Sequence, residues 1–209
     1  MHPLTFIGCI LYDQDMKKTK LLSKLEDLLS SPSFTIKEAE DRGVSREALA
    51  RYAREGKLER ISPGVYCSPS HELNVDFEWE DLIRITFTVN HGVVCLITAL
   101  SIYELTEEIS REFWLAIPHK QRAPKLANVR IVRMRNMVTG VTTKKIGDYK
   151  ISIFDPERTV IDTFRYLDKE LAIKALKKLS QKKLNLKKIR EYSKILKINI
   201  DPYLLTVST

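Results

Sequence analysis

The spacing of apolar residues predicts two short helices near the start of the chain. Leucines recur at helical spacing and stop before Ser30-Ser31-Pro32, which predicts a first helix carrying Leu21, Leu22, Leu25, Leu28 and Leu29. Thr35 and Glu38 have the spacing of a capping box, so a further helix is expected to begin at Ile36. Gly43 is expected to end it, because glycine adopts the left-handed conformation found at helix C-termini at little steric cost.

A third helix and a hairpin follow at once. Ser45 is a good N-cap, and the helix after it turns Leu49, Tyr52 and Ala53 inward until Gly56. Two β-prone runs, 58–61 and 65–67, flank Ser62-Pro63-Gly64, where proline and glycine favour a turn. Two short helices with a tight turn and a hairpin indicate a winged helix-turn-helix.

The pattern changes after Ser68-Pro69-Ser70, and the rest of the chain mixes helices with strands. Apolar stripes predict helices around residues 79–87 and 97–105, and strands are predicted at 113–117, 129–134, 141–146 and 149–154. Asp155 and Pro156 predict the cap and first residue of another helix, and two lysine-rich helices follow. The fold class is therefore α+β: an N-terminal winged helix-turn-helix, then a mixed α/β C-terminal domain with basic C-terminal helices. Expected divisions are a winged-helix domain at 16–70, an α+β domain at 71–209, and a non-native or disordered extension at 1–15, because Met16 resembles a natural start.

Charge favours an acidic partner. The 209 residues carry a net charge of +8, with a pI near 9.3. Residues 169–197 hold ten lysines and one arginine against two glutamates, whereas residues 20–67 hold nine basic and eight acidic residues. Any DNA contact by the winged helix must therefore depend on where its charges lie, with the basic C-terminal helices as a second contribution.

The helix at 46–54 has the composition of a DNA-reading helix. Arginine can bind guanine edges through two hydrogen bonds, and lysine or arginine elsewhere can neutralise phosphates. Two alternatives are an ordinary solvated helix face and a protein-interaction module. The expected partner is double-stranded DNA bound by two copies, as a dimer or as two monomers. The candidate contact residues are Ser45, Arg46, Glu47, Ala50, Arg51, Arg54, Lys57 and Arg60.

Neither a metal, nor a cofactor, nor a membrane segment is predicted. The three cysteines, at 9, 67 and 95, are widely spaced, as are the four histidines, so neither a disulfide framework nor a zinc site is indicated. Residues 4–12 form an apolar stretch too short to span a bilayer. A cytoplasmic, reducing location and no catalytic residue are expected.

The order of several motifs resembles the AbiEi family of type IV toxin-antitoxin antitoxins, over roughly residues 20–196. The motifs are KLERISPGVY at the wing, ALSIYELT, FWLAIPHKQRAP and ISIFDPERTVIDTFRY. The resemblance implies an N-terminal domain that represses its own operon at inverted repeats. It also implies a C-terminal domain that counters a nucleotidyltransferase-like toxin without a stable complex. Four residues of the last motif have no assigned role: Glu157, Arg158, Thr159 and Asp162.

Alternatives remain for the C-terminal domain. Arg158 and Asp162 lie four residues apart on a helix and are expected to pair, either as a structural ion pair or as part of a functional surface. A nuclease would need Asp155, Glu157 and Asp162 together around magnesium, but helical spacing points them in different directions. The chain could also be a plain regulator whose C-terminal domain dimerises or senses a ligand.

Basic residues at 119–122, 130, 133, 135, 144 and 145 have two interpretations: a second basic surface, or solvated loops and sheet edges. The lysine-rich helices likewise present either the polar faces of packed amphipathic helices or extra phosphate contacts.

Overall fold

The computed structural model describes residues 23–89, 91–124, 126–183 and 185–205. The chain divides into two compact units, Met1–Asn74 and Val75–Thr209. The extension expected at 1–15, together with Leu21 and Leu22, lies outside the described residues.

Unit 1 is a winged helix-turn-helix, as predicted. Its three-stranded antiparallel sheet has the order β1-β3-β2. The first strand was not predicted, because two residues are too few to show an alternating pattern; it pairs Phe34 with Tyr66 and Thr35 with Val65. The elements are α2 (Glu26–Leu29), β1 (Phe34–Thr35), α3 (Ile36–Glu40), α4 (Arg46–Arg54), β2 (Glu59–Ser62) and β3 (Val65–Cys67).

The predicted helix signals of unit 1 are present. The Thr35 side chain accepts from the Glu38 N–H at 3.3 Å, and the Thr35 N–H donates to Glu38 Oε2 at 2.7 Å, so the capping box is confirmed. Gly43 follows α3 with a φ of +74°. The predicted first helix is interrupted: Ser23 is helical, residues 24 and 25 form a turn in which Leu25 has φ −101° and ψ 4°, and α2 begins at Glu26. Leu25 is nevertheless buried in the core of this unit.

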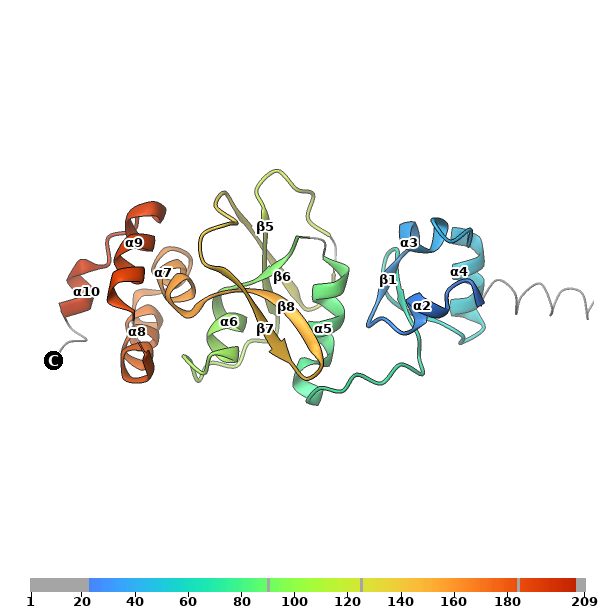
Figure 1. Ribbon diagram of the computed structural model, residues 1–209, viewed down its shortest axis with the longest axis horizontal. Coiled ribbons are helices and arrows are strands. Elements are labelled where there is room, and N and C mark those ends of the chain that lie inside the picture. Colours follow the sequence, from blue (N-terminus) through green and yellow to red (C-terminus); the bar gives the residue numbers. More distant parts are fainter. Residues whose placement is uncertain (1–22, 90, 125, 184, 206–209) are drawn as a thin grey trace, which may run out of the picture. The chain divides into compact units, whose positions relative to one another are not determined.

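Unit 2 is built on a five-stranded mixed sheet of order β6-β5-β4-β8-β7. Figure 1 labels its strands β5, β6, β7 and β8. The β5–β6 and β4–β8 pairs are parallel, and the β4–β5 and β7–β8 pairs are antiparallel. Its elements are α5 (Phe77–Thr88), β4 (Val93–Val94), α6 (Leu96–Ile102), β5 (Phe113–Pro118), β6 (Val129–Met134), β7 (Val141–Ile146), β8 (Tyr149–Phe154), α7 (Pro156–Tyr166), α8 (Lys169–Lys183), α9 (Leu186–Leu196) and α10 (Asp201–Leu205). The short β4 and α10 were not predicted, because two and five residues are too few to establish a period.

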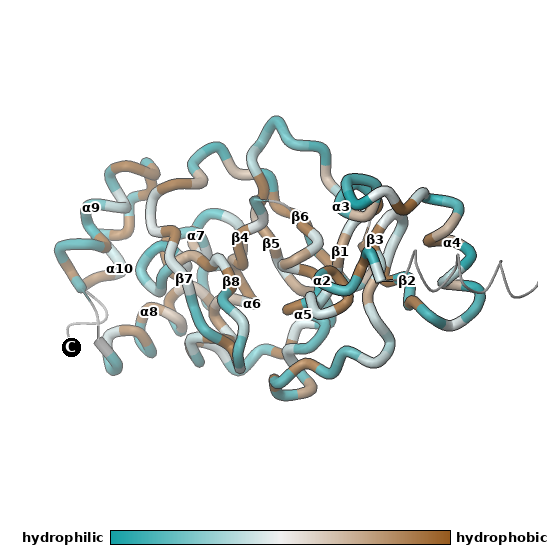
Figure 2. Tube along the Cα trace, turned by 45° about the vertical axis from the view of Figure 1, so that its right-hand side comes forward, coloured by the Kyte–Doolittle hydropathy of each residue, from teal (hydrophilic) through white to brown (hydrophobic). Residues whose placement is uncertain are grey.

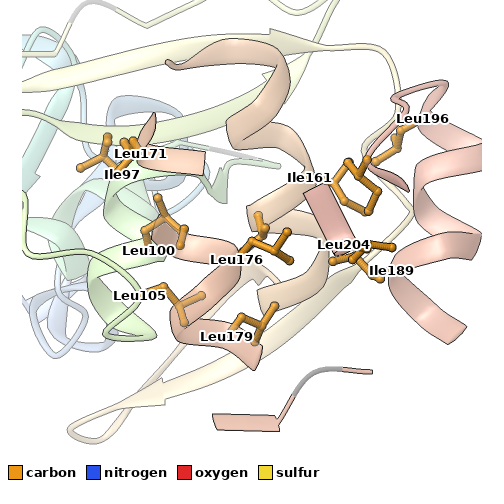
Figure 3. Packing of buried hydrophobic residues seen from close by; sticks show 13 residues of the cluster. Ile97, Leu100, Leu105, Ile161, Leu171, Leu176, Leu179, Ile189, Leu196 and Leu204 are labelled. Carbon is orange, nitrogen blue, oxygen red and sulfur yellow. The ribbon is translucent and has the colours of Figure 1, made fainter. Parts of the chain in front are cut away.

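Helices cover both faces of this sheet. Ala116 and Phe154 cluster with Leu96 at the start of α6, while α5 packs against β8, where Phe87 meets Tyr149 edge-on with ring centroids 6.0 Å apart. The C-terminal helices pack on α7 in a second core that includes Ile161, Leu176 and Ile189 (Figure 3). Figure 2 shows apolar and polar residues alternating along α9, as its amphipathic sequence predicts. Among the helices of the described ranges, none has the length and apolar character needed to cross a membrane.

Candidate nucleic-acid interface

The buried side of α4 sets which of its residues reach solvent. Leu49 and Tyr52, predicted to face inward, are fully buried, and Ala48 is buried beside them. The Ser45 side chain caps the helix by accepting from the Ala48 N–H at 3.3 Å. Because residues three and four apart share a helix face, the opposite side is left exposed. That side carries Arg46, Glu47, Ala50, Arg54 and the partly exposed Arg51.

The N-terminal turn of α4 presents both a base and an acid. Its own backbone N–H, and then the Ser45 hydroxyl, keep the pKa of the exposed Glu47 carboxyl below its usual value. Glu47 is therefore ionised at neutral pH, and an anion at a helix N-terminus is favourable. Arg46 is exposed next to it. This end of α4 offers a donor and an acceptor side by side.

At the other end of α4, one carboxylate approaches two cations. The two oxygens of Glu55 lie 3.8 Å from Arg51 Nε and 3.0 Å from Lys57 Nζ. The Arg51 guanidinium and the Lys57 ammonium also lie 5.2 and 5.8 Å from the centroid of the Tyr52 ring. Lys57, at the base of the wing, thus lies close to the C-terminal end of α4. Glu55 was not among the residues predicted from the sequence, although its spacing of four residues from Arg51 on a helix predicts a contact between the two.

The wing hairpin is anchored to the start of α3. Gly64 forms its turn with a φ of +86°, a conformation that favours glycine, and its carbonyl accepts from the Ile36 N–H at 2.9 Å. Arg60, on β2, donates from Nε to the Ser62 carbonyl at 3.4 Å and remains exposed. All eight candidate contact residues therefore lie on the surface of unit 1, and their contact with DNA stays a prediction.

The C-terminal motif has a different character, because its side chains are buried. Arg158 and Asp162 form the predicted ion pair, with Nε 2.8 Å from Oδ2 and each side chain only 2% exposed. Arg158 also donates to the backbone carbonyls of Thr139 at 2.7 Å and Asn136 at 3.1 Å, and its guanidinium lies 4.3 Å from the Phe154 ring centroid. Burial raises the pKa of Asp162, opposed by the neighbouring guanidinium. Arg158 thus links α7 to the connection between β6 and β7. This arrangement fits the interpretation of Arg158 and Asp162 as a structural ion pair.

Thr159 is equally internal. It is fully buried, and its hydroxyl donates to the Phe154 carbonyl at 3.1 Å, across the junction of β8 and α7. Asp155 caps α7 as predicted by accepting from the Arg158 N–H at 2.9 Å.

The prediction that the acidic residues near the start of α7 all point in different directions is wrong for two of them. Asp155 and Glu157 both meet Lys188 of α9, whose Nζ lies 3.0 and 3.2 Å from their carboxylates. They converge because Asp155 is the cap and Glu157 lies in the first turn, so both carboxylates reach the same end of α7. Although burial lowers it, these two carboxylates raise the pKa of Lys188. Tyr192 also donates to Asp155, at 3.0 Å. Lys188 and Tyr192 were missed because the contact joins distant parts of the chain.

These pairings bear on the nuclease alternative. Lys188 contacts both Asp155 and Glu157, and Arg158 pairs with Asp162, so each of the three carboxylates has a basic partner. Across the ranges that the structure describes, no group of three or more His, Cys, Asp or Glu residues is arranged to hold a metal ion.

Comparison with known proteins identifies unit 1. Residues 23–69 match the family model described as "Transcriptional regulator, AbiEi antitoxin". Over this segment the resemblance to the AbiEi antitoxins is confirmed. The matched segment contains α4 and the wing, and the match supports a role as antitoxin and transcriptional regulator.

A similar fold also occurs in a solved structure. The crystal structure of the RV2827C protein from Mycobacterium tuberculosis aligns with a TM-score of 0.57, at 14% sequence identity, over 84% of this chain and 71% of that chain. At this identity the similarity concerns the fold alone. A search among curated proteins finds no match.

The second basic surface considered for the C-terminal domain is divided by the sheet topology. Arg130 and Arg133 lie on β6 and Lys144 and Lys145 lie on β7, which are the two opposite edges of the sheet. Arg130 stacks on Trp114, with its guanidinium 4.5 Å from the ring centroid, and Lys145 lies 3.7 Å from Asp148. The edge interpretation is therefore confirmed for these residues.

Several lysines of the C-terminal helices are paired with acids. Lys174 contacts Glu170 on the same helix at 2.6 Å, and Lys178 contacts Glu107, before β5, at 2.9 Å. The inner sides of α8 and α9 contribute Leu176 and Ile189 to the second core. These helices are amphipathic and packed, and their contact with phosphate stays a prediction.

Proposed function

We propose that the protein is an antitoxin and transcriptional autorepressor of a type IV toxin-antitoxin operon. It binds inverted repeats upstream of its own gene through the winged helix, and it counters a nucleotidyltransferase-like toxin through the C-terminal domain. The main support is α4, a capped helix with a buried inner side and an exposed arginine-bearing side, within the segment that matches an AbiEi transcriptional regulator.

In this proposal α4 enters the major groove. Arg46, near the helix N-terminus, and Arg51 donate to guanine edges, and Glu47 accepts from a cytosine amino group. Ala50 is small and exposed between them, and it suits contact with a thymine methyl group. Ser45 holds the helix start, and phosphate contacts come from Arg54, Lys57 and Arg60.

Two copies are needed at a dyad site, as a preformed dimer or as monomers that meet on DNA. Because operator DNA is the partner, we expect the protein to work in the cytoplasm.

Binding to DNA from upstream of the gene tests the repressor half. Fluorescence anisotropy with this DNA and with a scrambled duplex, across a salt series, should give tighter binding to the upstream DNA and weaker binding to both as salt rises. Equal affinity for both duplexes would contradict operator recognition.

Co-expression with the product of the adjacent gene tests the antitoxin half. The chain should restore growth, and the variant Arg46→Ala/Arg51→Ala should restore it equally well, because its C-terminal unit is unchanged. Pull-down of the toxin is expected to recover no stable complex. If the chain fails to restore growth while it binds the upstream DNA, it is a plain regulator.

A further inference from the structure

We propose that Glu55 limits the affinity of the winged helix for DNA, because its carboxylate competes with the DNA for Arg51 and Lys57. The inference rests on the proposed function, in which α4 and the wing base contact DNA. It assigns an affinity-limiting role to an acidic residue that lies within a basic surface.

The first support is the shared contact. Each oxygen of the Glu55 carboxylate approaches a different cation, Arg51 Nε at 3.8 Å and Lys57 Nζ at 3.0 Å. The side chains are exposed by 42% for Arg51, 43% for Lys57 and 30% for Glu55, so all three are open to solvent. A phosphate presents the same kind of anionic oxygen to these donors. Glu55 therefore occupies the position of a phosphate group between the two cations.

The second support is that the arrangement can be exchanged. A distance of 3.8 Å is too long for a hydrogen bond, and Arg51 Nε is the buried side-chain nitrogen without a hydrogen-bond partner within the described ranges. Exposed ion pairs contribute little in water because solvent screens them. A phosphate can thus displace Glu55 without breaking a hydrogen bond at Arg51 Nε.

The third support is the location of Glu55 in the helix. It is the C-cap residue of α4, and a negative charge at a helix C-terminus is opposed by the helix dipole. The charge of Glu55 is therefore not needed for the helix itself. The Tyr52 ring lies near both cations, so it can keep them at the helix end after Glu55 is displaced.

The consequence is an affinity limit on both kinds of DNA. A non-operator duplex offers phosphate contacts but no matched base contacts, so competition from Glu55 removes a large part of its attraction. An operator adds base contacts by the N-terminal turn of α4, which are independent of Glu55. The competition therefore lowers both affinities, and at the operator a larger share of the binding free energy remains.

The test compares Glu55→Gln with Glu40→Gln. Glu40 is also exposed and is also at a helix C-terminal end, as the last residue of α3, so both variants lose one negative charge in a similar helix position. By anisotropy at low salt, Glu55→Gln should raise affinity for a scrambled duplex about fivefold and Glu40→Gln less than about twofold. On upstream DNA too, Glu55→Gln should raise affinity more than Glu40→Gln. Equal effects of the two variants would reduce the role of Glu55 to net charge and overturn the inference.

A second comparison removes the two cations. In an Arg51→Ala/Lys57→Ala background, Glu55→Gln should have no more effect on DNA affinity than Glu40→Gln, because the two cations that Glu55 contacts are absent. A persistent fivefold effect there would also overturn the inference. If the unmodified chain shows no preference for upstream DNA, operator recognition fails, whereas the effect of Glu55→Gln on the scrambled duplex can still be measured separately.

Discussion

Each unit contains an arginine and an acidic residue four positions apart along a helix, and the two pairs differ in burial. In α4, Arg51 is followed four residues later by Glu55; in α7, Arg158 is followed four residues later by Asp162. The first pair is exposed and separated by 3.8 Å, whereas the second is buried and separated by 2.8 Å. Both helices also begin with a side-chain cap, Ser45 or Asp155.

Burial separates the two roles. A buried arginine must satisfy its donors inside the protein, and Arg158 does so with Asp162 and two loop carbonyls. An exposed arginine keeps donors available for a partner, as Arg51 does. Sequence spacing alone therefore predicts that two residues meet, while the surrounding fold decides whether the meeting serves structure or binding.

The largest effect is expected from Arg158→Ala. Removing one partner of a buried ion pair leaves an uncompensated charge, which costs about 3–5 kcal/mol of unfolding free energy. Urea unfolding followed by circular dichroism measures it. Arg165→Ala, at an exposed site on the same helix, is the control and should cost less than about 1 kcal/mol. Equal losses would show that the buried network contributes little.

The next effect concerns Gly140, which has a φ of +74°. A Cβ there would lie 2.6 Å from Arg158 Cβ, whereas a Cβ at Gly56, with a φ of +70°, would meet nothing within 4 Å. Gly56→Ala should therefore lose only about 1–2 kcal/mol of stability from the left-handed backbone. Gly140→Ala should lose about 1–3 kcal/mol more from overpacking. Thermal or urea unfolding of both variants checks the difference, which would vanish if the loop moved aside freely.

Arg46→Ala and Arg51→Ala should act on binding and leave stability nearly unchanged. Each lost bidentate base contact costs about 1–3 kcal/mol of operator binding, measured by anisotropy. Lys37→Ala, on the exposed surface of α3, removes the same charge outside the proposed reading helix. Unaltered operator binding by the double arginine variant would mean that α4 is not the reading helix.

The smallest effect is expected from Ser45→Ala. Loss of an N-cap hydroxyl typically costs about 1 kcal/mol, and here it also removes the hydroxyl that hydrogen-bonds Glu47. Ser70→Ala, at an exposed loop position, is a control with the same chemical change. Urea unfolding should separate the two, and an equal response would show that the cap is dispensable.

The local signals in the sequence predicted much of the fold. The Thr35 capping box, the turn at Gly64 and the cap at Asp155 depend on residues a few positions apart, and each is present. Hairpin β7–β8 was predicted over the same residues that form it, since a glycine turn lies between two β-prone runs.

Features that depend on distant partners were not accessible. The strand β1 exists because Phe34 and Thr35 pair with β3, about thirty residues away in the printed numbering. Lys188 meets Asp155 and Glu157 only once α9 packs beside α7. Likewise, residues on β6 and β7 looked as if they could share a basic surface until the strand order placed them on opposite edges.

The connection Asn136–Gly140 is held by more than its own sequence. Its Asn136 side chain accepts from the Thr139 N–H at 2.9 Å, and two of its carbonyls accept from Arg158. Val138 at its tip is nevertheless 85% exposed. Because Arg158 of α7 holds these carbonyls, we expect proteolysis at this tip only after the connection separates from α7. Hydrogen exchange in the connection should consequently follow the cooperative unfolding of unit 2, so that a surface loop reports the lifetime of the whole unit.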